Sequence, residues 1–346
     1  MLFHRMASRD IRINLATEDY LMNHYETSEP ILLMYIQNPC VIVGKHQNVF
    51  EEVAIDVVKA EGVTLTRRLS GGGAVYDDLG NISFSFVIDK SQNTFGDYLT
   101  IVQPIVDALK EMGIEDVAVN GRNDILIGDK KISGNAMYTK KNKMFSHGTL
   151  LHDVDLTRLP NYLTISKEKL RSKHIQSVES RVTNIKPHLN IQYQKLTTEE
   201  FRDELLKRIY QVESIEDIQS KEIILSEFDK AKITKQVTDL YANEDWIYGH
   251  HQPYSLKERA YIKGVGLIES QMEVESGKIS AVYFTGDYFN QKDMNELTEK
   301  LIGSRLTKES LKTVLSHIEI SHYFNGLDLD TFTTFLVGEL NDDPIS

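Results

Sequence analysis

Three consecutive glycines, in the segment "TRRLSGGGAVYDD" from Thr66 to Asp78, constrain this chain more than any other feature. Consecutive glycines have the most backbone freedom to lose on folding. Such a run persists either as a loose linker or as bare backbone against which a ligand lies. It matches neither the phosphate loop that ends in Gly-Lys-Ser/Thr nor the dinucleotide fingerprint Gly-x-Gly-x-x-Gly.

The neighbours of the glycines favour a ligand over a linker. "VTLTRR" before them and "ISFSFVID" after them are predicted strands, the second with apolar residues at every other position from Ile82 to Ile88. The glycines therefore belong to a folded sheet. Arg67 and Arg68 add planar donors for a phosphate or carboxylate, and bare backbone N–H groups can form an anion-binding nest. We predict an anion site here.

Length and composition limit the class of protein. The chain has 346 residues, 41% hydrophobic and 26% charged, so we expect two domains of a globular protein. The net charge of −12 argues against a general nucleic-acid binder, which needs a basic surface. The single cysteine, Cys40, allows no intramolecular disulfide. Because we find neither a signal peptide nor an apolar run of ~20 residues, we expect a cytoplasmic location.

The predicted elements indicate an α+β fold of antiparallel sheets with flanking helices. We predict helices at residues 14–27, 94–113, 197–210, 226–242, 291–302 and 307–318, the first from acids in its first turn and the second from apolar residues at helical spacing. Thr197 and Glu200 form a capping box at the third helix, and Phe95 and Leu99 belong to the apolar face of the second.

The strands are predicted from period-two alternation. Runs 31–36 and 40–43 are expected to pair with each other, residues 123–154 to form a three-stranded meander, and residues 260–289 to form a small antiparallel sheet.

A change of residue composition at "NEDWIYGHHQPYS" marks the expected domain boundary. We expect a larger domain over residues 1–245, a linker over 246–255 and an accessory domain over 256–346. His250 and His251 are interpreted as linker residues, because no carboxylate or cysteine pattern accompanies them as it would in a metal site.

A lysine on a thinned strand is the second candidate feature. In "NGRNDILIGDKKISGNA", strict alternation places Lys131, Ser133 and Asn135 on one face of a strand. Gly134 leaves a position of that strand without a side chain, and a glycine inside a strand often marks the close approach of a ligand or another backbone. A lone lysine is usually a solvated surface charge, whereas a lysine in line with Ser133 and Asn135 is a better candidate for a ligand contact.

Several segments, in this order and spacing, resemble the lipoate–protein ligase family: "RRLSGGGAVYDDLGN", "GRNDILIGDKKISGNA", "HGTLLHDVDLTRLPNYL" and "SVESRVTN". "VIVGKHQN" resembles the family's substrate-pocket strand, and "GKISAVYFTGDYF" resembles the accessory domain of the long, two-domain ligases. The resemblance implies a biotin/lipoate-ligase-like catalytic domain over 1–245 and a small α+β accessory domain over 256–346.

The resemblance implies a two-step, ATP-dependent reaction. The carboxylate of lipoate attacks the α-phosphorus of ATP, which gives lipoyl-AMP and pyrophosphate. The ε-amine of a lysine on a lipoyl domain then attacks the mixed anhydride and releases AMP. Expected ligands are ATP, Mg²⁺ and lipoate. Expected acceptors are the glycine-cleavage carrier protein and the acyltransferase subunits of 2-oxoacid dehydrogenases, with no nucleic-acid or membrane partner.

The resemblance also implies roles for residues. Lys131 is the expected catalytic residue between the carboxylate and the α-phosphate, and Arg68 is expected to bind the phosphate or carboxylate of the adenylate. Asp124 is expected either to hold Mg²⁺ together with substrate phosphates or to form an Asx turn. Further ligand contacts are expected at Gly71, Gly72, Gly73, Ala74, Val75, Tyr76, Asn123 and His147, with Thr149 near the site.

The acyl chain of lipoate needs an apolar tunnel. The expected tunnel residues are Val41, Val43, Leu69 and Val75, and the run His46–Asn48 is expected to border the pocket. Asp77 stands where the family often has histidine, so its role stays open. The choice of acceptor protein and the preference between lipoate and octanoate stay open too.

Three alternatives are weighed against the ligase. An octanoyl or lipoyl transferase on the same fold would need a cysteine nucleophile, but Cys40 lies in an apolar strand, where cysteine is usually a small hydrophobe. A non-catalytic protein that binds lipoyl domains would not depend on Lys131. A biotin ligase is disfavoured because "RRLSGGGAV" and "HGTLL" resemble the lipoate branch.

Overall fold

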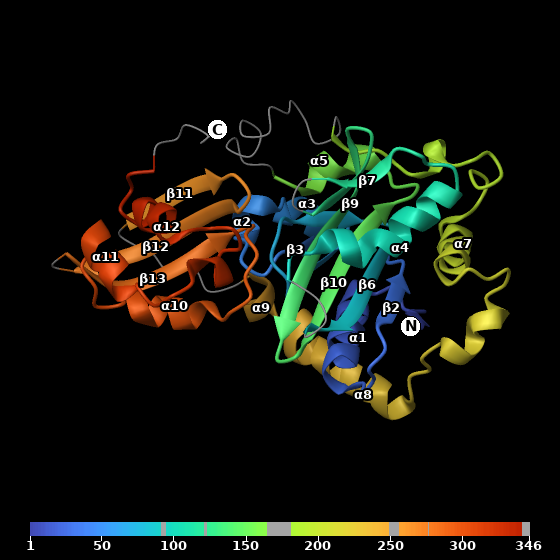
Figure 1. Ribbon diagram of the computed structural model, residues 1–346, viewed down its shortest axis with the longest axis horizontal. Helices are drawn as coiled ribbons and strands as arrows, with labels where there is room; N and C mark the ends of the chain where they lie inside the picture. The colour runs from blue at the N-terminus through green and yellow to red at the C-terminus, as the bar shows by residue number, and fades with distance from the viewer. Residues whose placement is uncertain (91–94, 121–122, 165–180, 249–255, 276, 341–346) are drawn as a thin grey trace.

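The computed structural model describes residues 1–90, 95–120, 123–164, 181–248, 256–275 and 277–340. Figure 1 shows a larger body, which holds the N-terminus, and a smaller body made from residues 256–340 that lies beside it. Each body has its own hydrophobic core. Within the described ranges, no helix is both long and apolar enough to cross a lipid bilayer.

A seven-stranded sheet is the frame of the larger body, in the order β1-β2-β6-β10-β9-β8-β7. Its strands are β1 (Leu2–Arg5), β2 (Ile31–Tyr35), β6 (Asn81–Asp89), β7 (Val117–Asn120), β8 (Asp124–Ile127), β9 (Lys130–Lys140) and β10 (Lys143–Leu151). The β1–β2 pair is parallel and the other neighbours are antiparallel. The predicted meander is confirmed as β8, β9 and β10.

Helices cover both faces of this sheet. Side chains of α4 (Tyr98–Glu111) and α7 (Thr198–Tyr210) share one core with the strands, and those of α1 (Ile11–His24) and α8 (Glu227–Gln236) share the other. Strand β6 is therefore buried on both faces: Phe84 belongs to the first core and Val87 to the second. A central strand with two covered faces gives the site a rigid floor.

Most of the predicted helices are present, with shifted ends. The capping box of Thr197 and Glu200 is confirmed at the start of α7. Helix α1 begins earlier than expected because Asp10 caps it, and α8 passes into a π-helical turn at Val237–Tyr241. Leu99 is 57% exposed, so its placement on the apolar face of α4 is wrong; Tyr98, at the first turn, takes the buried position.

The expected pairing of runs 31–36 and 40–43 is wrong. Strand β2 joins the seven-stranded sheet, whereas β3 (Cys40–Val43) is the centre of a separate sheet, between β4 (Thr64–Arg67) and β5 (Val75–Asp77). Every residue of β3 is buried, so its backbone groups need a strand on each side. Those partners come from the two sides of the glycine run, which alternation within 31–43 does not show.

Short helices cover the small sheet. The helices α2 (Val49–Glu52), α3 (Ile55–Ala60) and α5 (Leu159–Tyr162) pack around a core that includes Val41, Val43 and Tyr76. Part of the expected linker is a helix as well, α9 (Glu244–Tyr248). The rest of that linker, residues 249–255 with His250 and His251, lies outside the described residues.

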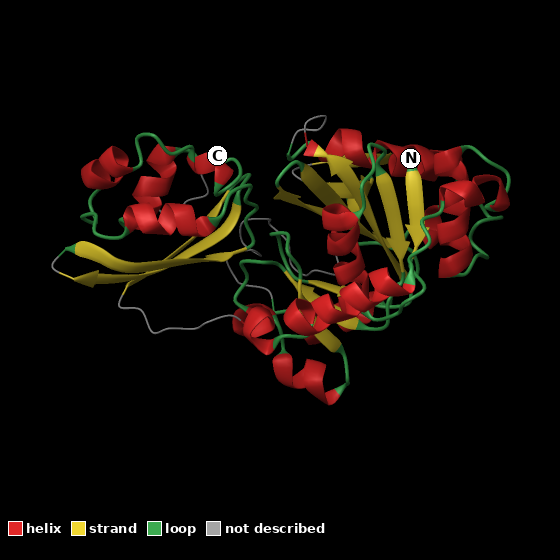
Figure 2. Ribbon diagram, turned by 90° about the horizontal axis from the view of Figure 1, so that it is seen from below, coloured by secondary structure: helices red, strands yellow, loops and turns green. Residues whose placement is uncertain are grey.

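The smaller body is a sheet covered on one side. Its strands β11 (Leu256–Ile262), β12 (Gly266–Glu275) and β13 (Lys278–Gly286) form an antiparallel meander, as predicted. Figure 2 shows the helices of this body on one face of the sheet. They are α10 (Met294–Leu301), α11 (Lys308–Val314) and α12 (Leu329–Leu336), of which the sequence analysis did not predict the last.

A β-bulge in β9 changes which residues share a face. Two steps along β9, from Ser133 to Lys131, lie opposite a single step along β8. Lys131 consequently lies over Gly134, where an added Cβ would come within 2.8 Å of the lysine Nζ, and Asn135 contacts Ser133 instead. The prediction that Lys131 shares a face with Ser133 and Asn135 is therefore wrong, because the extra residue interrupts the alternation.

Candidate active site

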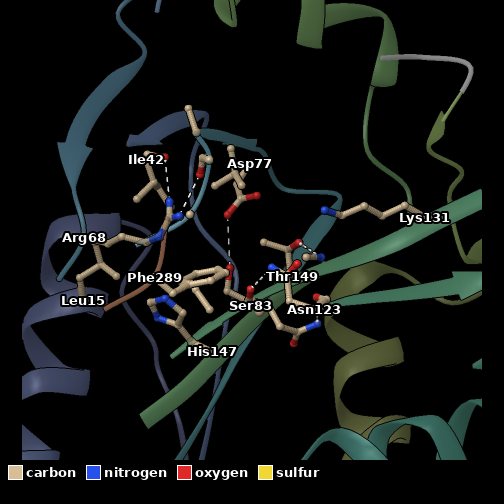
Figure 3. A pocket seen from close by; sticks show the side chains of 18 of the residues that line it. Leu15, Ile42, Arg68, Asp77, Ser83, Asn123, Lys131, His147, Thr149 and Phe289 are labelled. Atoms are coloured by element: carbon tan, nitrogen blue, oxygen red, sulfur yellow. Dashed lines mark hydrogen bonds between the residues drawn. The ribbon is translucent and has the colours of Figure 1, made fainter. Parts of the chain in front are cut away.

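A cavity of about 130 Å³ is lined by residues of both sheets of the larger body and by Phe289, which follows β13 (Figure 3). The predicted site residues that line it are Arg68, Gly72, Gly73, Ala74, Val75, Asn123, Lys131, His147 and Thr149. Gly71, Tyr76 and Asp124 are not among the lining residues. The structure thus brings the glycine run and the lysine strand to one cavity.

Lys131 presents its ammonium group at this cavity and is held by an acid. Its Nζ lies 2.8 Å from Oδ1 of Asp124, and Nη2 of Arg181 lies 2.5 Å from the other carboxylate oxygen. Gly134 is needed beneath it, because a Cβ there would be 2.8 Å from the Nζ. The sequence analysis expected a ligand or another backbone to lie close to Gly134; the group that does so is the Lys131 side chain. A second cation beside Asp124, Arg181, was not predicted from the sequence.

Asp124 does not fit the role of a free Mg²⁺ ligand. Each of its oxygens is engaged by a cation, Lys131 or Arg181. The described residues also contain no group of three or more His, Cys, Asp or Glu side chains that could hold a metal ion. In this structure Asp124 holds Lys131 and Arg181, and its expected role as a Mg²⁺ ligand stays a prediction.

Asn123 joins two strands at the edge of the cavity. Its amide donates to the carbonyl of Asn135, whose own amide donates to the carbonyl of Asn123 at 3.0 Å. The backbone N–H of Asn135 donates to the same carbonyl at 2.9 Å. This reciprocal pair fixes the start of β8 against the bulged part of β9, and so fixes the position of Lys131.

Arg68 holds the glycine run from inside the cavity wall. Its Nη2 donates to the carbonyls of Gly71 and Gly73 at 2.7 and 2.8 Å, and its Nε donates to Ser70 Oγ at 3.0 Å. Only 6% of the residue is exposed, and burial lowers the pKa of the guanidinium to about 10, so it stays charged at neutral pH. Among the described residues, no carboxylate forms an ion pair with it. A buried cation without an ion-paired carboxylate favours an anionic ligand.

Gly72 meets two demands that only glycine satisfies here. Its φ is +91°, and a Cβ would lie 3.0 Å from both Arg68 Nη2 and the ring of Phe289. Its N–H donates to the carbonyl of Tyr288 at 3.3 Å, while a Cβ on Gly71 would lie 2.1 Å from that same oxygen. The loop after β13 therefore lies directly on the glycine run, and the sequence analysis missed Phe289 as a cavity residue.

The run His46–Asn48 does not line the cavity, contrary to expectation. His46 stacks on Tyr288 with 4.4 Å between ring centroids, and its Nε2 lies 2.9 Å from Oδ1 of Asn290. Gln47 accepts from the N–H of Gly44, and Asn48 caps α2. This run therefore joins the two bodies. The sequence does not show this, because the contact depends on where the loop with Tyr288 and Asn290 lies in the folded protein.

Most of the expected tunnel residues are core residues instead. Val41 and Val43 are fully buried in the core of the small sheet, and Leu69 packs beside the core under α1. Tyr76 is in that first core too, stacked on Tyr162 at 4.8 Å, so its side chain does not reach a ligand in the cavity. Alternation explains this, because Val75 faces the cavity and its neighbour Tyr76 faces away. The apolar cavity wall is made by Val75 with Leu15, Tyr35 and Ile42.

Asp77 contributes a buried carboxyl group to the cavity wall (Figure 3). Its Oδ2 accepts from Gln37 Nε2 at 2.6 Å and from Ser83 Oγ at 3.3 Å, and its Oδ1 has no partner among the described residues. Burial raises the pKa of this carboxyl to about 7, and the two hydrogen bonds and Arg68 offset only part of that effect. Asp77 is therefore about half protonated near neutral pH.

Asp77 should make the protein less stable as the pH rises. The folded state keeps the Asp77 proton up to about pH 7, whereas the unfolded chain releases it near 3.8. Between these values the folded state binds more protons, so the free energy of unfolding falls with increasing pH, by on the order of 4 kcal/mol in total. Asp77→Asn should remove this fall. Denaturant unfolding at pH 5 and pH 8 checks it, and an equal decline in both proteins would contradict it.

Arg67, next to Arg68, points away from the cavity. Its guanidinium donates to the carbonyls of Gly44, Lys45 and Gln47 at 2.8 to 3.0 Å, and to those of Trp246 and Ile247 at 2.7 to 3.0 Å. Burial lowers the pKa of this guanidinium to about 10 as well. Of the two arginines only Arg68 lines the cavity, whereas Arg67 ties β4 to two distant segments.

Cys40 is fully buried in β3, and burial raises the pKa of its thiol well above the ordinary value. It does not line the cavity. A nucleophilic cysteine needs an accessible thiolate, which these surroundings disfavour.

Family models match both bodies of the chain. A model of the lipoyl protein ligase A/B catalytic domain matches residues 10–210, and a model of the bacterial lipoate protein ligase C-terminus matches residues 251–336. The chain is 37% identical over 323 residues to lipoate-protein ligase LplJ of Bacillus subtilis, which covers 93% of this chain and 96% of the relative. It is 38% identical over 320 residues to lipoate–protein ligase 1 of Staphylococcus aureus, covering 92% and 94%.

Solved structures have the same fold. LipL1 of P. falciparum in complex with lipoate superposes with a TM-score of 0.77 at 24% identity, covering 97% of this chain and 99% of the other. A lipoate-protein ligase A bound with ATP gives 0.56 at 25%, covering 72% and 99%. The bipartite lipoate protein ligase of Thermoplasma acidophilum, reported together with its E2 lipoyl domain, gives 0.58 at 26%, covering 74% and 98%.

Proposed function

This chain belongs to the lipoate–protein ligase family, and from that membership we infer that it activates lipoate with ATP and transfers the lipoyl group to a protein lysine. The fold is the α+β fold of the lipoate ligases. The observation that carries the inference for this chain's own residues is the cavity itself. It brings an ammonium group, a buried guanidinium with no ion-paired carboxylate among the described residues, and a glycine-rich backbone to one space whose walls are partly apolar.

We propose that Lys131 and Arg68 supply the positive charge of the first step. A carboxylate and a triphosphate repel each other, so their reaction needs fixed cations, and preorganised charge is usually the largest catalytic contribution. Lys131, held by Asp124, would lie between the carboxylate and the α-phosphate. Arg68 would bind the adenylate while it keeps the carbonyls of Gly71 and Gly73 turned inward.

The apolar and backbone parts of the cavity would take the rest of the ligand. The backbone from Gly72 to Val75, together with Asn123 and His147, is proposed to contact the adenylate, since these residues line the cavity. The walls formed by Leu15, Tyr35, Ile42 and Val75 would take the acyl chain. Tyr76 would support this wall from behind.

Mg²⁺ is proposed to arrive with the nucleotide phosphates, whose charge it neutralises, because it binds substrate phosphates readily. Both oxygens of Asp124 already pair with cations, Lys131 and Arg181. The acceptors are proposed to be lipoyl domains, namely the glycine-cleavage carrier protein and the 2-oxoacid dehydrogenase acyltransferase subunits. The E2 lipoyl domain reported with the archaeal relative supports this class.

The domain division and the cellular location of the protein follow from the same reasoning. We propose a catalytic domain over 1–245, a linker over 246–255 and an accessory domain over 256–346, which the two separate hydrophobic cores support. We also propose a cytoplasmic location, in keeping with ATP as substrate and with a single, reduced cysteine.

Mass spectrometry of an acceptor tests the function and separates the ligase from the transferase. An apo lipoyl domain, incubated with the protein, lipoate, ATP and Mg²⁺, should gain one lipoyl group, and it should gain none without ATP. Cys40→Ala should keep the rate within about threefold, because a buried cysteine acts as a small hydrophobe. Lipoylation without ATP, or its loss in Cys40→Ala with the fold intact by circular dichroism, would instead support the cysteine-dependent transferase.

A further inference from the structure

A continuous chain of hydrogen bonds runs from helix α1 to the glycine run. Glu18 carboxylate oxygens lie 3.0 and 3.1 Å from Nδ1 of His147, whose Nε2 lies 2.7 Å from Ser70 Oγ. Ser70 Oγ in turn accepts from Arg68 Nε at 3.0 Å, and Arg68 goes on to the carbonyls of Gly71 and Gly73. Each of the four residues whose side chains form this hydrogen-bonded series is at most 7% exposed. Neither Glu18 nor Ser70 was singled out from the sequence.

The direction of each hydrogen bond follows from its donors. Arg68 Nε can only donate, so it occupies one acceptor position of Ser70 Oγ. The geometry allows the Ser70 hydroxyl to donate to His147 Nε2 in the tautomer whose ring proton is on Nδ1 and points to Glu18.

The arrangement resembles a Ser-His-acid triad, but its surroundings oppose nucleophilic attack. In a triad, the serine oxygen faces the substrate and gives its proton to histidine. Ser70 is 1% exposed and is not a cavity residue, whereas Arg68 and His147 are. The Arg68 Nε donor also withdraws electron density from Ser70 Oγ. The group that this series of hydrogen bonds places at the cavity is therefore the Arg68 guanidinium, and Figure 3 shows the residues around it.

We propose that Glu18, His147 and Ser70 are positioning residues, which hold Arg68 and the glycine run in the arrangement that binds the acyl-adenylate. The proposal rests on the proposed function, in which Arg68 binds that adenylate. The Glu18 charge fixes the His147 tautomer, His147 fixes the Ser70 hydroxyl, and Ser70 orients the guanidinium through Nε. Its other nitrogens are then aimed at the carbonyls of Gly71 and Gly73.

A double-mutant cycle between Ser70 and Arg68 tests this. The dissociation constant of a non-hydrolysable lipoyl-adenylate analogue is measured by calorimetry for the wild type, Ser70→Ala, Arg68→Met and the double variant. Ser70→Ala should weaken binding about tenfold in the wild type, because it removes one hydrogen bond to a charged group. It should have no further effect in Arg68→Met, since nothing remains to be positioned. Equal weakening in both backgrounds would overturn the proposal.

Conservative and control variants separate positioning from general damage to the core. Ser70→Thr keeps the hydroxyl and should restore binding to within about threefold of the wild type. Ser85→Ala removes another fully buried serine hydroxyl, which has no partner among the described residues and lies opposite His147 in the sheet, and it should leave binding unchanged. If Ser85→Ala weakens binding as much as Ser70→Ala, the positioning role is rejected.

The His147 tautomer gives a readout that does not depend on ligand binding. Nitrogen-15 spectra of the wild type should show a protonated Nδ1 and an unprotonated Nε2, and Glu18→Gln should disturb this pattern. A wild type with the proton on Nε2, or an acyl ester on Ser70 in mass spectra, would overturn the proposal. These results are distinct from a failure of the proposed function, in which the wild type would not bind the adenylate analogue or lipoylate an acceptor.

Discussion

Lys131→Ala is expected to lower the rate of lipoyl-AMP formation by about 10³-fold or more while the protein stays folded. The variant removes the ammonium group at the cavity, which is proposed to lie between the two reacting anions. It costs little stability, because the side chain is partly exposed and its ion pair with Asp124 is shared with Arg181. Lipoate-dependent pyrophosphate release measures the rate, and circular dichroism checks the fold.

Two matched variants show whether the position or the charge matters. Lys130→Ala removes the preceding lysine of β9, which does not line the cavity, and should keep the rate within about twofold. Lys131→Arg keeps a cation for Asp124 but changes its shape, so the rate should stay well below that of the wild type. A rate for Lys131→Ala within tenfold of the wild type would remove Lys131 from the mechanism and favour a non-catalytic, lipoyl-domain-binding protein.

Arg67→Met is expected to destabilise the larger body by about 3 kcal/mol or more. The variant removes the guanidinium donor from five buried or partly buried carbonyls in two segments, and leaves the bond from Trp246 Nε1 to the Arg67 carbonyl as a remaining tie of β4 to one of them. Lysine should not rescue it, since an ammonium group cannot reproduce the planar set of donors. Chemical denaturation of the purified protein, followed by tyrosine and tryptophan fluorescence, measures the loss.

An exposed arginine provides the control for Arg67. Arg12 pairs with Asp10 at the start of α1, and its side chain is 37% exposed. Arg12→Met should therefore cost less than about 1 kcal/mol, as exposed ion pairs generally do. If Arg67→Met unfolds at the same denaturant concentration as Arg12→Met, the buried contacts of Arg67 do not stabilise the fold.

The elements that the sequence predicted well depend on local interactions. The capping box of α7 and the β8–β9–β10 meander each rest on residues close together in the chain. The pairing of β3 with β4 and β5 could not be predicted in this way, because its partners lie on either side of the glycine run. The bulge in β9 was missed for a similar reason, since it depends on the register against β8.

The candidate site shows the same division. The glycine run, Arg68 and Lys131 could be predicted, because their residue types in these motifs already indicate anion chemistry. Glu18 and Phe289 could not: one is an ordinary acid on an amphipathic helix, and the other comes from the smaller body. They reach the site only through packing between segments more than a hundred residues apart.

Arg67 and Arg68 are adjacent and chemically identical, and the sequence by itself determined that this chain has two cations beside a bare backbone, which predicts an anion site. Only the tertiary structure decided which arginine does what. Successive side chains of a strand point in opposite directions, so one guanidinium enters the cavity and the other meets carbonyls from residues 44–47 and 246–247. The physical reason is that direction is a property of the folded backbone, whereas charge is a property of the residue.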